Sequence, residues 1–306
     1  MKKLLPFLLV LGVITWACKN DTKKTDTIET VNEVETESEI IEEVDEVLEE
    51  ETKKEVEDIK STKQKVEKKQ AADIKYEDTA VAEDDPVKVK PISHGTLVLE
   101  FEKMVIYVDP VGGAENFASY RKPTIILVTD IHGDHLNVET IEAVKHTNTL
   151  IVVPHAVAEK LPKAWEPNVS VINNGQTNSY TIGTTEISIE AIPMYNLRKE
   201  ALEFHPKYRG NGYVITMGNQ RTYISGDTED IPEMRALKNI DKAFICMNLP
   251  YTMTVERAAD AVLEFKPKVV YPYHYRGTDG MSDVEKFKKL VTSKNQTIDV
   301  RLLNWY

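Results

Sequence analysis

Thr129-Asp130-Ile131-His132-Gly133-Asp134-His135 follows directly after the apolar run Pro123–Val128. A short apolar run rich in β-branched residues predicts a buried strand. The glycine favours a sharp turn, so the loop is expected at the C-terminal end of that strand. Two imidazoles and two carboxylates packed into Asp130–His135 are the ligand types that divalent metals use. The stretch therefore predicts a metal-dependent active site on an α/β scaffold.

Short apolar strands recur along the rest of the chain, with helical patterns among them. The predicted strands are Thr96–Phe101, Met104–Val108, Ile125–Thr129, Leu150–Val153, Val169–Ile172, Glu186–Ile192, Tyr213–Met217, Thr222–Ser225, Ala243–Met247 and Val269–Tyr273. The predicted helices are Val138–Lys145, Ala156–Leu161, Pro232–Leu237, Val255–Phe265 and Val284–Leu290. Strands broken by helices in this way predict one layered α/β domain over residues 91–306.

The N-terminus carries the features of an export signal. A basic start is followed by the apolar segment Leu4–Trp16, which is too short to span a bilayer and ends at Ala17-Cys18. A small residue before Cys is typical of a bacterial lipoprotein signal over residues 1–18, with Cys18 lipidated. Three positions before Cys18, where such signals usually have an aliphatic residue, this chain has Thr15. A plain or uncleaved signal is therefore the alternative. We expect an exported lipoprotein, anchored to a membrane and facing the periplasm or the cell surface.

Residues 19–90 differ in composition from the rest. They contain no glycine, and residues 1–90 hold 15 lysines against 24 acidic residues, so most of the net charge of −12 lies there. Such a segment buries too little apolar surface to offset its ordering entropy, which predicts a disordered acidic tether, with a weak coiled coil as the alternative. Residues 91–306 are nearly balanced in charge, which disfavours a nucleic-acid partner.

The loop Asp130–His135 resembles the metal-binding signature of the metallo-β-lactamase superfamily, His-x-His-x-Asp-His, with Asp130 in the first His position. Gly226-Asp227-Thr228 and Tyr271–Tyr275, each after a predicted strand, resemble two later segments of that family. The resemblance is closest to the branch of ascorbate-6-phosphate lactonase-like proteins, through Tyr195-Asn196 and His205-Pro206-Lys207. It implies an αββα sandwich: two mixed sheets packed together and flanked by helices.

The resemblance also implies two divalent metal ions and their ligands. Zn²⁺ is the first expectation, with Mn²⁺ or Fe²⁺ as alternatives because carboxylates are numerous. The expected ligands are Asp130 and His132 for the first metal, Asp134, His135 and His274 for the second, and Asp227 between them. His205 is the preferred remaining ligand of the first metal, because the amide of Asn196, the alternative, is a poor zinc ligand. Asp130 also leaves open a weak or empty first site, with one functional metal.

Further residues are candidates for supporting roles. Asp109, in Val108-Asp109-Pro110, either orients the ligand loop or forms a turn. His94 lies in a turn that opens the first strand, and it has either a structural or outer-shell role or a catalytic one. The candidates for outer-shell or substrate contact are Tyr195, Asn196, Lys207, Arg209 and Tyr251; the cations would grip an anionic substrate or belong to a solvated loop. His146 and His155 are expected to face solvent, and Cys246 to pack in a strand.

The expected activity is hydrolysis of a small molecule. A metal-bound hydroxide at a dinuclear site would cleave an ester, lactone, amide or phosphodiester, with Asp134 or Asp227 orienting it. A non-catalytic, membrane-tethered module that keeps the fold and a metal is the alternative from another class. A nuclease is the weaker third reading, because the charge balance and the expected export both oppose it.

Overall fold

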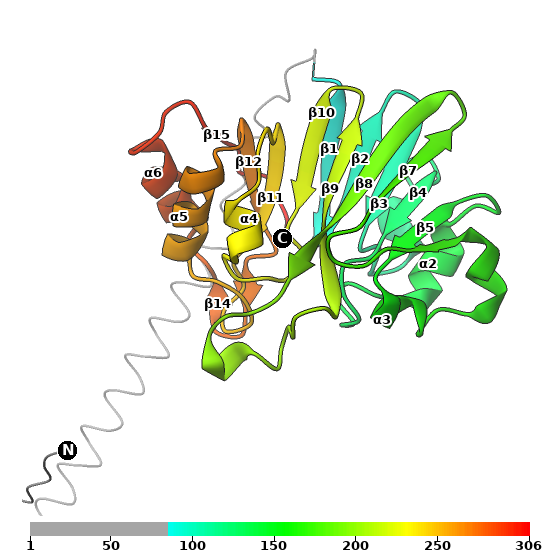
Figure 1. The fold of residues 1–306 in the computed structure, drawn as a ribbon, viewed down its shortest axis with the longest axis horizontal. Helices are drawn as coiled ribbons and strands as arrows, with labels where there is room; N and C mark the ends of the chain where they lie inside the picture. The colour runs from blue at the N-terminus through cyan, green and yellow to red at the C-terminus, as the bar shows by residue number, and fades with distance from the viewer. Residues whose placement is uncertain (1–84) are drawn as a thin grey trace, which may run out of the picture. The chain divides into compact units, whose positions relative to one another are not determined.

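Two β-sheets packed face to face form the centre of residues 85–306, the part of the chain that the computed structural model describes. Helices α2 and α3 lie outside the first sheet, and α4, α5 and α6 lie outside the second (Figure 1). This is the predicted αββα sandwich, and the prediction of one layered α/β domain is confirmed.

The first sheet has six strands in the order β1-β2-β3-β4-β5-β6. They are β1 Val87–Ser93, β2 Thr96–Phe101, β3 Met104–Val108, β4 Ile125–Leu127, β5 Leu150–Val153 and β6 Val169–Val171. The first three pair antiparallel, and β3 to β6 pair parallel. β4 is buried at all its positions, as expected for a central parallel strand covered on both faces.

The second sheet has seven strands in the order β15-β12-β11-β10-β9-β8-β7. They are β7 Thr177–Ile182, β8 Thr185–Met194, β9 Gly210–Met217, β10 Gln220–Ile224, β11 Lys242–Cys246, β12 Val269–Tyr273 and β15 Asp299–Val300. A separate hairpin joins β13 Arg276–Gly277 to β14 Gly280–Met281. Because β10, β11 and β12 pair parallel, the residues that follow them emerge at the same edge of the sheet.

The helices are short, and side chains cap the N-termini of the longer ones. They are α2 Val138–Val144, α3 His155–Ala158, α4 Pro232–Arg235, α5 Val255–Phe265 and α6 Val284–Thr292, with 3₁₀ turns η1 Ala114–Phe117, η2 Lys163–Asn168 and η3 Lys199–Ala201. Asn137 caps α2 and Thr254 caps α5, each accepting a backbone N–H. Within residues 85–306, no helix has the length and apolar character needed to cross a membrane.

Alternation along the strands divides the core into two layers. Leu97 and Leu99 of β2 face the core between the sheets, whereas Val98 between them joins the cluster under α2 and α3. The same alternation repeats in β4, where Ile126 packs with Ile141 of α2. A period of two residues thus fixes which face of the first sheet meets the second sheet.

The structure corrects the predicted start of the domain. β1 begins at Val87, inside the segment assigned to the tether, because Val87 and Val89 are buried while the alternating lysines mask the strand in the composition. β7 was also missed, since none of its positions is buried. The predicted signal, Cys18 and residues 19–84 of the tether lie outside the described residues.

Two smaller expectations about turns need correction as well. His94 lies in the hairpin between β1 and β2, so it opens the second strand rather than the first. Gly133 has no positive φ, and a Cβ there would meet nothing within 4 Å. The turn of the ligand loop therefore does not depend on a glycine.

Candidate metal centre

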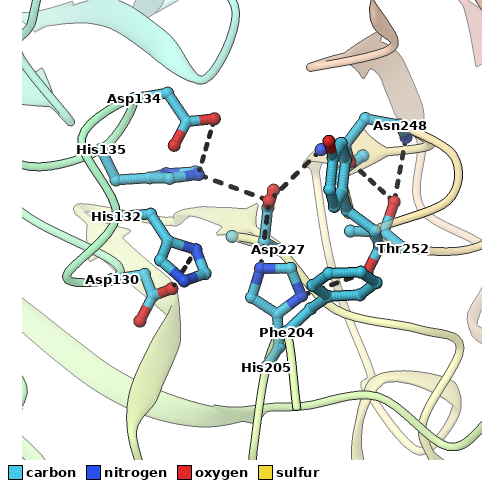
Figure 2. A network of polar contacts seen from close by, with 12 residues as sticks. Asp130, His132, Asp134, His135, Phe204, His205, Asp227, Asn248 and Thr252 are labelled. Atoms are coloured by element: carbon cyan, nitrogen blue, oxygen red, sulfur yellow. Dashed lines mark hydrogen bonds and ion pairs between the residues drawn. The ribbon is translucent and has the colours of Figure 1, made fainter. Parts of the chain in front are cut away.

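The predicted ligands meet at one edge of the sandwich, on loops that follow β4, β8, β10 and β12. The loops supply them as two groups whose ligand atoms lie within 4.8 Å of one another. We call Asp134, His135, Asp227 and His274 the Asp134 set, and Asp130, His132 and His205 the Asp130 set. Figure 2 shows most of these residues around Asp227, which lies between the sets.

The Asp134 set converges on one point. His274 Nε2 lies 3.2 Å from Asp134 Oδ2, 3.2 Å from His135 Nε2 and 3.4 Å from Asp227 Oδ1. Asp227 Oδ2 is 3.5 Å from His135 Nε2 (Figure 2). Asp227 Oδ1 is buried without a hydrogen-bond partner. Two imidazoles and two carboxylates aimed inward, with an unpartnered buried oxygen, fit a divalent cation.

Asp109 fixes the ring of His135. A carboxylate can only accept, so His135 Nδ1 donates to Asp109 Oδ2 at 2.7 Å. Asp109 is fully buried and also accepts from the backbone N and the Oγ1 of Thr129, at 2.7 and 2.6 Å. This arrangement holds His135 Nε2 toward the other ligands, as outer-shell carboxylates do at metal sites. The structure thus places Asp109 in the orienting position and not in a plain turn.

The electrostatics of the Asp134 set favour a cation. Burial alone would lower the pKa of His135, but the carboxylates of Asp227 and Asp109 raise it well above its ordinary value. Burial would raise the pKa of Asp227, yet the neighbouring His274 and His135 rings hold it well below the usual range. The negative potential that stabilises a proton on His135 also stabilises a divalent ion at the same point.

Two glycines allow these loops to approach one another. Gly226 has φ +60°, and a Cβ there would lie 2.5 Å from Met194 Sδ and 3.2 Å from the carbonyl oxygen of Asn211. A Cβ on Gly95 would lie 3.3 Å from both His135 Cε1 and His274 Cδ2. Glycine is therefore required before Asp227, and a side chain at Gly95 would press on the two rings.

His94 borders the centre without joining either ligand set. Its ring lies 5.2 Å from that of His274, and its Nδ1 is 3.3 Å from the Tyr306 hydroxyl. Burial, with His274 and Arg276 nearby, lowers the pKa of His94 to about 4, so the ring is neutral at pH 7. The role that fits this position is structural.

His205, rather than Asn196, reaches the Asp130 set. The Tyr251 carbonyl can only accept, so His205 Nδ1 donates to it at 3.2 Å, which leaves Nε2 with its lone pair. Nε2 is buried without a hydrogen-bond partner, 3.4 Å from Asp227 Oδ2. Asn196 instead holds the loop: its Nδ2 donates to the carbonyls of Ala201 and Tyr251, at 2.8 and 2.7 Å.

Arg209 contacts two members of the Asp130 set. Its Nε and Nη2 donate to Asp130 Oδ1 and Oδ2 at 2.9 and 2.7 Å, and Nη2 also lies 3.2 Å from His132 Nε2. Asp130 is fully buried. Arg209 was expected to contact substrate or to lie in an outer shell, and the structure ties it to the first ligand of the signature. Burial lowers the pKa of His132, although Asp130 opposes this.

The other candidates have partners of their own. Lys207 Nζ and the Tyr195 hydroxyl both contact Glu233, at 3.0 and 2.9 Å, so they form a separate cluster. His155 is 70% exposed beside Glu159, as predicted. Cys246 is fully buried, and burial raises the pKa of its thiol to about 12, which confirms a packing role over a nucleophile.

Sequence reasoning missed two polar residues beside Asp227. Asn248 Nδ2 donates to Asp227 Oδ2 at 3.3 Å (Figure 2). The Thr252 hydroxyl donates to Asn248 Oδ1 at 2.7 Å and so fixes the orientation of the Asn248 amide. Asn248 follows β11 at the same edge as the ligands that follow β10 and β12. For Asn248, a polar residue just after the apolar stretch Ala243–Met247 was the available signal.

Residues 105–275 match the family model of the beta-lactamase superfamily domain, which is more than half of the chain. Fold, ligand sets and this match define a metal-dependent hydrolase, and the chain belongs to the metallo-β-lactamase superfamily. Within it, the relatives are UPF0173 metal-dependent hydrolases. The protein of Thermococcus onnurineus is 31% identical over 228 residues, and that of Pyrococcus furiosus 30% over 227; each alignment covers 69% of this chain and 95% of the relative.

Solved structures agree with this assignment. A candidate metal-dependent hydrolase of Parabacteroides distasonis has 40% sequence identity and a TM-score of 0.62, covering 71% of this chain and 94% of that one. Igni18, a metallo hydrolase of Ignicoccus hospitalis, has a TM-score of 0.60 at 20% identity, over 71% of this chain and 95% of its own, and shows the shared fold.

Proposed function

We propose that the Asp134 set binds the divalent metal on which hydrolysis depends, with Zn²⁺ as the first choice, and that the substrate is a small ester, lactone, amide or phosphodiester. The observation that carries this is the convergence of four ligand atoms within 4.8 Å from three separate loops. His135 is fixed in place by the fully buried Asp109. The resemblance to ascorbate-6-phosphate lactonase-like proteins supports a lactone among these classes.

The residues of the Asp134 set have different roles in the proposed reaction. A divalent metal held there lowers the pKa of water and polarises the bond to be cleaved. Asp134 is the exposed member, with 45% of its side chain accessible, so it would accept a hydrogen bond from the attacking water and orient it. Asp227 is buried and held by Asn248, so it keeps its position while the substrate changes.

The number of ions is separate from this proposal. The dinuclear centre expected from the family signature needs the Asp130 set to bind an ion as well. One ion on the Asp134 set would support the same reaction, because zinc sites with one ion and an open position hydrolyse comparable bonds. Mn²⁺ or Fe²⁺ would suit the same mixture of imidazole and carboxylate.

Location forms a further part of the proposal. Ala17-Cys18 after a short apolar segment supports export and lipid anchoring at Cys18, so the domain would act at a membrane facing the periplasm or cell surface. Metabolic labelling with an alkyne fatty acid tests this. Wild-type protein should take up the label and partition with membranes, and Cys18→Ser should lose both properties.

The test of function compares variants on generic substrates. Purified protein with Zn²⁺ or Mn²⁺ is assayed on esters, lactones and bis(4-nitrophenyl) phosphate, beside Asp134→Ala. His155→Ala is the control, since it removes an exposed imidazole outside both ligand sets. Activity in wild type and control that is lost in Asp134→Ala supports the proposal. Bound metal with no turnover in any of the three proteins favours the non-catalytic, tethered module instead.

A further inference from the structure

Arg209 contacts the Asp130 set, and this difference between the two ligand sets affects how many ions the centre can bind. Resting on the proposed function of the Asp134 set, we infer that the guanidinium of Arg209 takes the place of the ion of the Asp130 set, so that the centre binds one divalent ion per chain.

The first step concerns Asp130. Both of its carboxylate oxygens accept from Arg209, through Nε at 2.9 Å and Nη2 at 2.7 Å. This fork-to-fork geometry is the strong form of the arginine–carboxylate pair. Asp130 is fully buried and the Arg209 side chain is 17% exposed, so water screens the pair little. The residue that replaces the first His of the signature is therefore already bound to a cation.

The second step concerns His132. A guanidinium can only donate, so Arg209 Nη2 faces the lone pair of His132 Nε2 at 3.2 Å. The two N–H groups of Nη2 already make the shorter contacts to Asp130 and Phe204, so His132 shares one of these hydrogens and does not receive its own. The other ring nitrogen, Nδ1, faces Asp130 Oδ2 at 3.1 Å. An ion on Nε2 would have to take the place where this guanidinium nitrogen lies. Asp130 is thus satisfied without a metal, and the guanidinium blocks the approach of an ion to Nε2 of His132.

The third step concerns charge. The two sets contain three carboxylates, Asp130, Asp134 and Asp227. Asp109, buried behind His135, is a fourth carboxylate beside them. One divalent ion and the Arg209 guanidinium stay within these four negative charges, whereas two ions beside the guanidinium would exceed them. A second ion on the Asp130 set would also sit next to the guanidinium, where two positive charges a few ångströms apart in a buried site repel strongly.

Arg209 is also held on its far side, which argues against a mobile surface arginine. Its Nη2 donates to the carbonyl of Phe204, the residue before His205. The guanidinium therefore spans the ligand loop and the His205 loop. His205 is the member of the Asp130 set whose ligand atom is buried without a hydrogen-bond partner and is not faced by Arg209; it lies 3.4 Å from Asp227 Oδ2. One imidazole and a shared carboxylate are fewer ligands than a structural or catalytic zinc uses.

Metal content tests this inference. Full-length protein is saturated with Zn²⁺ and desalted, and its zinc content is measured by inductively coupled plasma mass spectrometry. Wild type should hold about one ion per chain, and the double variant Asp130→His/Arg209→Ala about two. Arg209→Lys keeps the positive charge and should stay near one. Circular dichroism shows that each variant is folded. Two ions in wild type, or one ion in the folded double variant, would overturn the inference.

Further measurements separate this inference from the proposed function. Asp134→Ala should fall from one ion to none, which places the ion on the Asp134 set. Two ions in wild type with activity would refute the role of Arg209 and leave the hydrolase intact, whereas no ion in wild type would remove both. Should the double variant not fold, Co²⁺ paramagnetic resonance of wild type decides: an uncoupled signal supports one ion, and a spin-coupled pair contradicts it.

Discussion

The two ligand sets share one loop and similar residue types, yet their surroundings are opposite. In the Asp134 set a carboxylate, Asp109, lies behind His135 and leaves its inward nitrogen open. In the Asp130 set a cation, Arg209, contacts the atoms that an ion would use. The types of ligand residue alone therefore do not define a metal site. The contacts on either side of each ligand decide whether its lone pair is available.

Arg209→Ala should have the largest effect, on stability. It leaves the fully buried Asp130 without its partner, which should lower the free energy of unfolding of chelator-treated protein by about 3–5 kcal/mol. Urea denaturation measures this. Zn²⁺ should recover part of the loss, because an ion can then replace the guanidinium at Asp130.

Arg198→Ala is the matched control for that result. Arg198 pairs with the buried Glu229 at 2.6 Å and also donates to the carbonyls of Pro250 and Thr252, and none of these residues is a ligand of either set. Its removal should also destabilise the protein, but with no extra recovery in Zn²⁺. Equal recovery in the two variants would mean that the ion does not replace Arg209.

His135→Ala and His132→Ala test directly whether the two ligand sets differ in metal binding. Zinc sites of four ligands contribute roughly 10–16 kcal/mol, so losing His135 should weaken metal binding by about 100-fold or more and remove activity. His132→Ala should change the affinity far less, since His132 faces Arg209. Competition with a chromogenic chelator measures both. Similar losses in the two variants would show that both sets bind metal.

Asp109→Asn probes the orienting contact and should have a smaller effect. Outer-shell partners of ligating histidines typically contribute about 10–100-fold in metal affinity. We expect a loss in that range by chelator competition, with the stoichiometry unchanged. Thr96→Val is the control, because Thr96 Oγ1 donates to the Asp109 carbonyl at 2.6 Å and does not contact His135. Unaltered affinity in Asp109→Asn would leave His135 without its proposed support.

Much of this centre followed from local sequence signals. The strand patterns placed β2, β3, β5 and β12 to the residue, because apolar residues dominate each of them and turn or polar residues flank them. The loop Asp130–His135, Asp227 and His274 were found as ligand types that follow such strands. β7 escaped because it carries no buried position, and β1 because lysines alternate with its buried valines.

The side-chain partners were beyond the sequence. The Asp130–Arg209 pair joins residues 79 positions apart, and the packing of the loop that carries His205 decides it. The same loop turns Lys207 and Tyr195 toward Glu233, which no periodicity signals. Ligand types are thus readable from a short motif. Whether the ligands are open depends on long-range contacts that only the fold brings together.

Asn137→Ala should have the smallest effect and tests whether the ligand loop depends on its own helix. The Asn137 side chain accepts from Thr140 N at 2.7 Å and caps α2, so its loss should lower the free energy of unfolding by about 1 kcal/mol. Metal affinity should not change, because the turn at His132 is closed by its own bonds: the N–H groups of His135 and Leu136 donate to the His132 carbonyl at 3.0 and 2.8 Å.

Thr254→Ala, which removes the cap of α5 behind the second sheet, is the matched control for Asn137→Ala, with the same expected cost and denaturation assay. If Asn137→Ala weakens metal binding and Thr254→Ala does not, helix α2 helps to set the positions of Asp134 and His135. The contrast between the two ligand sets would then lie partly in the loop backbone and not wholly in Asp109 and Arg209. If the two variants lose equal amounts of unfolding free energy and no metal affinity, Asp109 and Arg209 remain the cause of that contrast.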